Sequence, residues 1–192
     1  MVPFFYYPYT YAATLSSRLW RRVSEGEAKV ILSVVYTSDT NMTELHSYKS
    51  SFDDVEGVVV KLEKETNLGC PLQSQLSRIF AYREEEIHED DIVITTDVDI
   101  FVYDKRVLLP FKEPYDTWIF EYQHTVRTGC TFPMNLLGMT ARNWRVVLED
   151  PVSIAEPRGK YELISRFNTT LRGRFNNPNF NWGTDQVQIE AN

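Results

Sequence analysis

The most telling segment of the chain reads Asp91-Ile92-Val93-Ile94-Thr95-Thr96-Asp97-Val98-Asp99. Five of its first six residues are β-branched, which predicts a buried β-strand. This strand would deliver two carboxylates, Asp97 and Asp99, to its carboxyl end, the place where open α/β sheets bind their ligands. On a strand that continued through Asp99, both carboxylates would point to the same face.

Two carboxylates this close are compatible with folding if a cation lies between them or if one of them stays protonated. Oxygen ligands without sulfur suit Mg²⁺ or Mn²⁺. We therefore expect Asp97 and Asp99 to form a metal site that holds a phosphorylated ligand.

The preceding segments alternate between strand and helix patterns. Residues 30–36 form a nearly continuous apolar run, typical of a strand buried on both faces. Residues 43–52 favour a short helix, residues 57–62 a second strand, and residues 72–86 an amphipathic helix. This order predicts one parallel sheet with right-handed crossovers, and it places the polar loop 37–41 and the two carboxylates at the same edge.

The second half of the chain is less regular, and its elements are predicted one by one. We expect strands at 118–122 and 135–139, a helix at 142–148, a loop at 149–160, and a helix that opens at 184–186. The last pattern runs into Asn192, so we expect the sequence to be a domain excised from a longer chain.

Composition narrows the class of protein. The 192 residues are 43% hydrophobic, enough for one sizeable core and hence a single domain. A net charge of −7 argues against nucleic-acid binding through a general basic field. The sequence contains no run of eighteen apolar residues, so no membrane-spanning helix is predicted. Cys70 and Cys130 form no CxxC pair, so we do not expect a zinc site. With only two cysteines, we expect a reduced, intracellular, cytoplasmic setting.

The segment Ile92–Phe101 resembles the DxD segment of the GT-A glycosyltransferases, which move a sugar from a nucleotide diphosphate to an acceptor, usually with Mn²⁺. The resemblance runs in order over residues 30–192. It includes Thr37-Ser38-Asp39 after the first strand, Ser77-Arg78-Ile79 before the DxD strand, and Asn181-Trp182-Gly183-Thr184-Asp185-Gln186 late in the chain. The chain looks most similar to the N-terminal glycosyltransferase domains of large multidomain chlorovirus (algal virus) proteins.

The resemblance implies a GT-A fold. Residues 30–104 would form a Rossmann-like nucleotide-binding half with a mostly parallel central sheet flanked by helices, and residues 105–192 an acceptor-binding half. The implied reaction transfers a sugar from UDP-glucose or a related UDP-hexose to a glycan acceptor, with Mn²⁺ or Mg²⁺. In the viral case the glycan would decorate a capsid protein, and the setting would be the host cytoplasm.

The same resemblance implies roles for individual residues. Asp99 would bind the metal, and Asp97 the metal or the ribose. The other implied donor-binding residues are Tyr36, Thr37 and Ser38 at the uracil and ribose, Arg78 at the ribose or diphosphate, Val98 beside the carboxylates, and Asn135 and Gly138 at the donor sugar.

Two late residues would act on the acceptor side. Trp182 would be a stacking platform for an acceptor sugar. Asp185 would be the base of an inverting enzyme, or the stabiliser or nucleophile of a retaining one. Many members of the family add a third metal ligand, often a late His. No His follows His124 here, so phosphates and water, His124, or a residue beyond 192 would complete the shell.

Simpler interpretations stay open. Arg78 could be a surface residue, Asp185 a helix N-terminal acid, and Tyr36 and Trp182 packing residues. The acidic residues between Glu84 and Asp91 read as a solvated helix end and loop. Two other functions are a haloacid-dehalogenase-type phosphatase, whose DxDx segment Asp97–Ile100 superficially fits, and a non-catalytic nucleotide-sugar-binding module.

Overall fold

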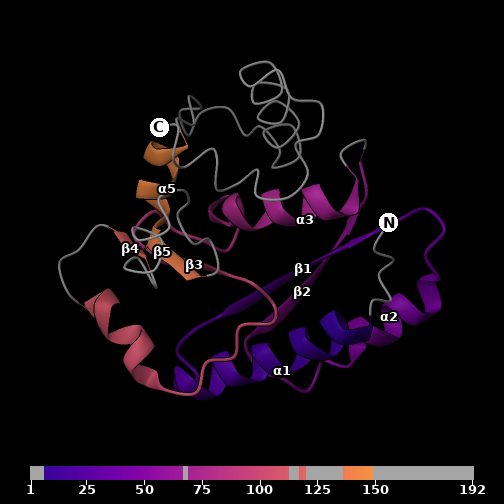
Figure 1. The fold of residues 1–192 in the computed structure, drawn as a ribbon, viewed down its shortest axis with the longest axis horizontal. Coiled ribbons are helices and arrows are strands. Elements are labelled where there is room, and N and C mark those ends of the chain that lie inside the picture. The colour runs from indigo at the N-terminus through magenta and orange to yellow at the C-terminus, as the bar shows by residue number, and fades with distance from the viewer. Residues whose placement is uncertain (1–6, 67–68, 113–116, 120–135, 149–192) are drawn as a thin grey trace, which may run out of the picture. The chain divides into compact units, whose positions relative to one another are not determined.

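The structure is a computed structural model that describes residues 7–66, 69–112, 117–119 and 136–148. The chain divides into two compact units (Figure 1). Unit 1 contains Met1–Cys70 and Asp97–Glu113, and unit 2 contains Pro71–Thr96 and Pro114–Asn192. Helices and strands occur in both units, so the predicted α/β class is confirmed. Each unit is built from two separate stretches of sequence.

Unit 1 is built around a pair of parallel strands. Its elements are α1 (Tyr7–Val23), β1 (Val30–Tyr36), α2 (Met42–Ser50), β2 (Val58–Lys64) and the 3₁₀ helix η2 (Lys105–Lys112). β1 and β2 run parallel, with α2 in the connection between them. The predicted strand–helix–strand unit is therefore confirmed for the first three elements.

The core of unit 1 lies on one face of this strand pair. Leu32 of β1 is paired with Val60 of β2, and both side chains are buried with Ala13 and Phe52. Alternate residues of a strand share a face, so Val34 packs against the same cluster. α1 and α2 lie along the same side of β1 and β2, where they cover this apolar face (Figure 1).

The helix α1 was not predicted from the sequence. Its buried residues recur at helical spacing, as Ala12, Ala13, Ser16, Ser17, Trp20 and Val23. A pattern search for large apolar residues overlooks this face because four of its members are alanine or serine. Small side chains suit the site, since they let the helix backbone approach the sheet closely.

Unit 2 holds a separate sheet of three strands. Its strands are β3 (Ile92–Thr96), β4 (Thr117–Ile119) and β5 (Leu136–Thr140), in the order β3-β5-β4, and both pairings are antiparallel. Helices α3 (Cys70–Ile79) and α5 (Ala141–Val147) and the 3₁₀ helix η1 (Ala81–Arg83) complete the described part. α3 starts at Cys70, the last residue of the first stretch of unit 1.

The expectation of one parallel sheet that includes β3 was wrong. β3 pairs antiparallel with β5, so that Ile94 lies opposite Gly138. Leu136 to Met139 are all buried, which places β5 at the centre of its sheet. Apolar runs predict that a strand is buried, but its partner and direction depend on which other segment reaches it.

The described helices also differ in extent from the predicted ones. α3 ends at Ile79, and η1 takes up three residues of the predicted helix 72–86. α2 begins after Asn41, whose side chain accepts hydrogen bonds from the N–H groups of Thr43 and Glu44. Such a cap supplies the first turn of a helix with acceptors that it otherwise lacks.

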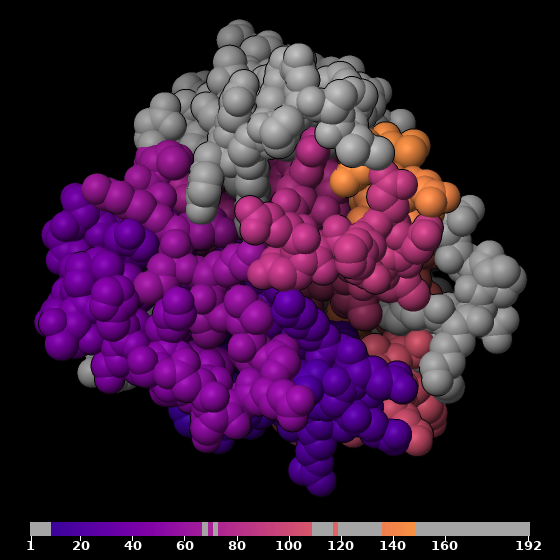
Figure 2. Space-filling model, turned by 180° about the vertical axis from the view of Figure 1, so that it is seen from behind, coloured from indigo at the N-terminus to yellow at the C-terminus, as the bar shows by residue number. Residues whose placement is uncertain are grey.

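Part of α5 is exposed to solvent. Figure 2 shows one face, on which part of the stretch that holds β5 and α5 (orange) reaches the surface, and Val146 of α5 is 72% exposed. No helix in the described ranges is both long and apolar enough to cross a membrane. The loop predicted at 149–160 and the helix predicted from 184 lie outside the described residues.

Candidate functional site

The two carboxylates of the DxD segment stand on a turn. β3 ends at Thr96, and the N–H of Ile100 donates a hydrogen bond to the carbonyl of Asp97, 3.1 Å away. β3 therefore ends directly before Asp97, and both carboxylates follow its carboxyl end, as the sequence predicted. Asp97 is partly buried and Asp99 is exposed. We call residues 97–100 the carboxylate turn.

Val98 anchors the carboxylate turn. Its side chain packs against the core of unit 1, which contains Ala13, Leu32, Phe52 and Val60. The carboxylates of Asp97 and Asp99 cannot enter this core with Val98, because burying an unpaired charge in an apolar core costs much free energy. The sequence assigned Val98 to the donor site, and the structure places its side chain on the hydrophobic core.

The donor set at the turn suits a hard cation. Among the residues that the structure describes, no group of three or more His, Cys, Asp or Glu side chains could hold a metal ion. Asp97 and Asp99 would thus supply at most two carboxylate ligands. Mg²⁺ commonly binds through one or two carboxylates, several waters and substrate phosphates. His124, one of the three alternatives left open for completing the shell, lies outside the described residues.

The polar loop after β1 is a second turn of unit 1. Thr40 closes it, because its N–H donates to the carbonyl of Thr37 (3.2 Å) and its Oγ1 accepts from the N–H of Thr37 (3.1 Å). The Thr37 hydroxyl donates to the carboxylate of Asp39. This hydrogen bond, together with one from a backbone N–H, lowers the pKa of Asp39.

These contacts limit what Thr37 can do for a ligand. Its backbone N–H is engaged with Thr40 and its hydroxyl with Asp39, so a nucleotide would have to displace one of them. Ser38 is exposed and Tyr36 is partly buried at the end of β1. Thr40 was not among the predicted site residues, although the spacing from Thr37 to Thr40 is that of a β-turn.

Cys70 and Glu65 lie at the same edge of the β1–β2 pair. The N–H of Glu65 donates to the carbonyl of Tyr36 (2.7 Å), and Glu65 Oε1 accepts from the N–H of Cys70 (2.9 Å). Burial, followed by the nearby Glu65 carboxylate, raises the pKa of the Cys70 thiol to about 11. A thiol of this kind stays protonated near neutral pH and is a poor nucleophile.

Arg78 and Gly138 belong to unit 2. Arg78 lies in the last turn of α3 and is partly buried. Gly138 is buried in β5, between Ile94 of β3 and Trp118 of β4. The other predicted site residues, Asn135, Trp182 and Asp185, lie outside the described residues.

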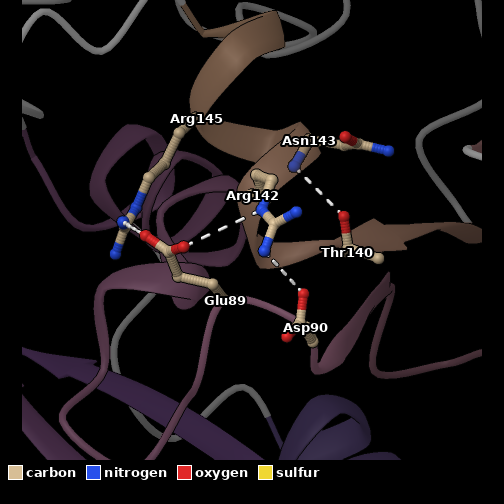
Figure 3. Close-up of polar contacts among 6 residues, drawn as sticks. All are labelled: Glu89, Asp90, Thr140, Arg142, Asn143 and Arg145. Carbon is tan, nitrogen blue, oxygen red and sulfur yellow. Dashed lines mark hydrogen bonds and ion pairs between the residues drawn. The ribbon is translucent and has the colours of Figure 1, made fainter.

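Unit 2 also contains a polar network that sequence analysis did not predict (Figure 3). Glu89 lies between two arginines of α5: its Oε1 is 2.7 Å from Arg145 Nη1, and its Oε2 is 3.8 Å from Arg142 Nε. Asp90 Oδ1 is 2.8 Å from Arg142 Nη2. Glu89 and Asp90 therefore form ion pairs that the sequence did not indicate, although their side chains remain 40% and 87% exposed, as expected of a solvated loop.

The network fastens the loop before β3 to α5. The carbonyls of Asp91 and Glu89 accept the N–H groups of Ala141 (2.9 Å) and Arg142 (3.0 Å) at the helix start. Thr140 caps the same helix by accepting the N–H of Asn143 (3.2 Å). Because the two arginines already face carboxylates, this cluster serves to hold structure and is a poor receptor for an anion.

Comparison with known proteins returned no match to a family model, to a curated protein or to a solved structure.

Proposed function

We propose that this chain is a metal-dependent glycosyltransferase of the GT-A type, which transfers a hexose from a UDP-sugar to a glycan acceptor. The observation that supports this best is the carboxylate turn. The partly buried strand β3 ends in it, Val98 fastens it to the core, and Asp99 is exposed beside Asp97. Such a turn offers two carboxylate oxygens to a divalent cation from an anchored backbone.

Asp97 and Asp99 would hold Mn²⁺ or Mg²⁺. When bound, the cation neutralises charge on the diphosphate of the UDP leaving group. The carboxylates fix its place, and Val98 keeps the backbone between them on the core. The net charge of −7 makes a local cation all the more necessary for a nucleotide diphosphate to bind.

Several roles complete the proposal. Tyr36 and Ser38, at the end of β1, would contact the uracil and ribose, and Thr37 would do so after releasing Asp39 or Thr40. The resemblance also implies donor contacts for Arg78, through charge-assisted hydrogen bonds, and for Gly138. Trp182 would stack on the acceptor, Asp185 would act at the reacting carbon, and Asn135 would contact the donor sugar. In the viral case the acceptor glycan would belong to a capsid protein.

Calorimetric titration with UDP tests the proposal. We expect wild-type protein to bind UDP with Mn²⁺ present and to bind it much more weakly in EDTA. Asp99→Asn should weaken the Mn²⁺-dependent binding at least about tenfold, since removing one stabiliser of a developing charge typically costs about 10²–10³ in rate. Slow hydrolysis of a UDP-hexose should fall in the same variant.

Asp53→Asn is the matched control for this experiment. Asp53 is an exposed aspartate of unit 1, and its substitution changes the net charge by the same amount. Equal effects of the two substitutions would point to a general charge effect. Absence of UDP binding by wild-type protein under all conditions would refute the proposed function. Tight binding without any turnover of UDP-hexoses would favour a binding module.

A further inference from the structure

α1 is linked to the carboxylate turn by a hydrogen bond and by a shared core cluster in unit 1. Ser16 of α1 donates a hydrogen bond from its hydroxyl to the carbonyl of Ile100, at 2.9 Å. Ala13, one helical turn earlier, belongs to the core cluster against which Val98 packs. The helix therefore reaches the turn through one polar contact and one apolar cluster.

The hydrogen bond from Ser16 to Ile100 is unusual for a serine within a helix. Ser16 is only 4% exposed and lies within α1, where a serine hydroxyl commonly bonds a carbonyl of its own helix. Here the hydroxyl donates to a carbonyl 84 residues away in the sequence. The acceptor belongs to Ile100, the residue whose N–H closes the carboxylate turn.

Asp99 lies between the two anchored residues. Val98, directly before it, packs on the core, and Ile100, directly after it, is held by Ser16 through its carbonyl and by Asp97 through its N–H. The backbone of Asp99 is thus fixed on both sides while its side chain remains exposed. A fixed backbone limits the positions that the Asp99 carboxylate can take before a cation binds, which favours binding.

We propose that Ser16 is a positioning residue, which orients the Asp99 carboxylate for a divalent cation by holding the carbonyl of Ile100. This inference rests on the proposed metal-dependent function. It assigns a task to α1, which precedes the segment 30–104 predicted to bind the nucleotide.

Two measurements on three variants test the role of Ser16. Ser16→Ala should speed hydrogen exchange of the Ile100 amide about fivefold, because one hydrogen bond that closes the turn on α1 is lost. The same variant should weaken Mn²⁺ binding, measured by electron paramagnetic resonance of free Mn²⁺, by about five- to tenfold. Ser16→Thr retains a hydroxyl for the same carbonyl and should restore both values toward wild type.

Ser17→Ala is the matched control. Ser17 is the next residue of α1 and is 3% exposed, so it is buried to the same extent as Ser16. Its substitution removes a buried hydroxyl from the same helix and should leave both readouts unchanged. A similar thermal midpoint for the two alanine variants would show that Ser16→Ala does not act through loss of folding.

The outcomes separate the two proposals. If Ser16→Ala changes Ile100 exchange or Mn²⁺ binding no more than Ser17→Ala does, the positioning role is overturned while the metal site stands. If wild-type protein binds no Mn²⁺, the proposed function is overturned and the inference with it. Parallel effects on exchange and Mn²⁺ affinity, reversed by threonine, support the inference.

Discussion

The reactivity of Cys70 is set by its neighbours. Burial and the Glu65 carboxylate both disfavour the thiolate, and together they raise the pKa of the thiol from 9.0 to about 11. The protonated thiol is therefore the form that the folded state favours. Its contribution to stability is present below the unfolded pKa of 9.0 and is lost as the pH rises through about 11.

We expect slow alkylation of Cys70. In a Cys130→Ser background, where Cys70 is the only thiol, the rate with iodoacetamide at pH 8 should be about 100-fold below that of the same variant unfolded in urea. The factor follows from a pKa raised from 9.0 to about 11, since each pKa unit changes the thiolate population tenfold. The rate should keep rising up to about pH 11. Equal rates in the folded and unfolded protein would contradict the raised pKa.

Gly57 is required by two local conditions. Its φ of +77° is unfavourable for other residues, and a Cβ there would collide with the guanidinium of Arg21. That guanidinium donates hydrogen bonds to the carbonyls of Gly26 and Ala28, so it cannot move without losing them. The side chain of Arg21, near the end of α1, thus packs closely against Gly57, the residue before β2.

Gly57→Ala should destabilise unit 1 by about 2–3 kcal/mol in urea unfolding, the sum of backbone strain and the displaced Arg21. Gly26→Ala is the control, because Gly26 also has a positive φ (+87°) but a Cβ there would meet Arg21 at an ordinary 3.6 Å. It should cost about 1–2 kcal/mol. In an Arg21→Ala background the difference between the two variants should shrink, and a constant difference would argue against the clash.

At the scale of elements, Trp144 joins α5 to β3. It is fully buried, and its indole N–H donates to the carbonyl of Val93 at 3.1 Å. Thr95 adds a buried hydrogen bond from its hydroxyl to the carbonyl of Leu137 in β5 (3.4 Å). Helix and sheet of unit 2 are therefore held by polar contacts inside an apolar core, where such contacts are costly to lose.

Trp144→Phe should lower the free energy of unfolding by about 2–4 kcal/mol, because it removes this hydrogen bond and leaves a smaller ring in the core. Trp20→Phe is the matched control. Trp20 is 6% exposed, and its indole N–H has no hydrogen-bond partner in the described part of the chain. Trp20→Phe should cost less, and equal costs in chemical denaturation would show that the Val93 hydrogen bond contributes nothing.

The ion pairs around α5 should contribute unequally. Arg145 and Glu89 are 25% and 40% exposed in their side chains, whereas Arg142 and Asp90 are 60% and 87% exposed. Water and salt screen the second pair more strongly. We expect Glu89→Gln to cost about 0.5–1 kcal/mol and Asp90→Asn less. Urea unfolding in 0.05 M and 1 M salt measures this, and a cost of Glu89→Gln that does not fall with salt would contradict it.

At the scale of the whole molecule, unit 1 is discontinuous in sequence. Residues up to Cys70 supply the strands and the helices α1 and α2, and Asp97–Glu113 returns to the same unit after β3. The returning segment buries Val98 partly and Val102 fully, and it accepts the hydrogen bond of Ser16. Unit 1 therefore depends on residues that follow β3.

A fragment of residues 1–70 should fold poorly alone, because it lacks this returning segment. We expect lower protection of its amides from hydrogen exchange than in the full chain, and a gain in protection when a peptide of residues 97–113 is added. A scrambled peptide of the same composition is the control. Full protection of the isolated fragment would contradict the expected dependence.

Much of the fold was predictable from local pattern. The apolar run 30–36 is β1, the polar stretch that follows it is a turn, and Asp91–Thr96 contains β3. These predictions hold because strand formation and burial depend on neighbouring residues in the chain. The helix α1 was missed because its buried face is made of small residues.

The candidate site was predictable only in its chemistry. The sequence pointed to Asp97 and Asp99, but not to the turn that carries them or to Ser16, which lies 84 residues from its acceptor. It also pointed to Thr37 within Thr37-Ser38-Asp39, but not to Thr40 or to the hydrogen bonds that occupy the N–H and hydroxyl of Thr37. Contacts between distant segments leave no period or spacing in the sequence.

By itself, the sequence determined the α/β class, most strand and helix positions, and the two carboxylates after β3. Only the tertiary structure decided that β3 pairs antiparallel with β5, that Val98 packs on the core of unit 1, and that Glu89 and Asp90 are paired with arginines of α5. Local propensity and hydrophobic period act over a few residues. The partner of a strand or charge depends on which distant segments can be buried together, and this is settled when the chain closes on itself.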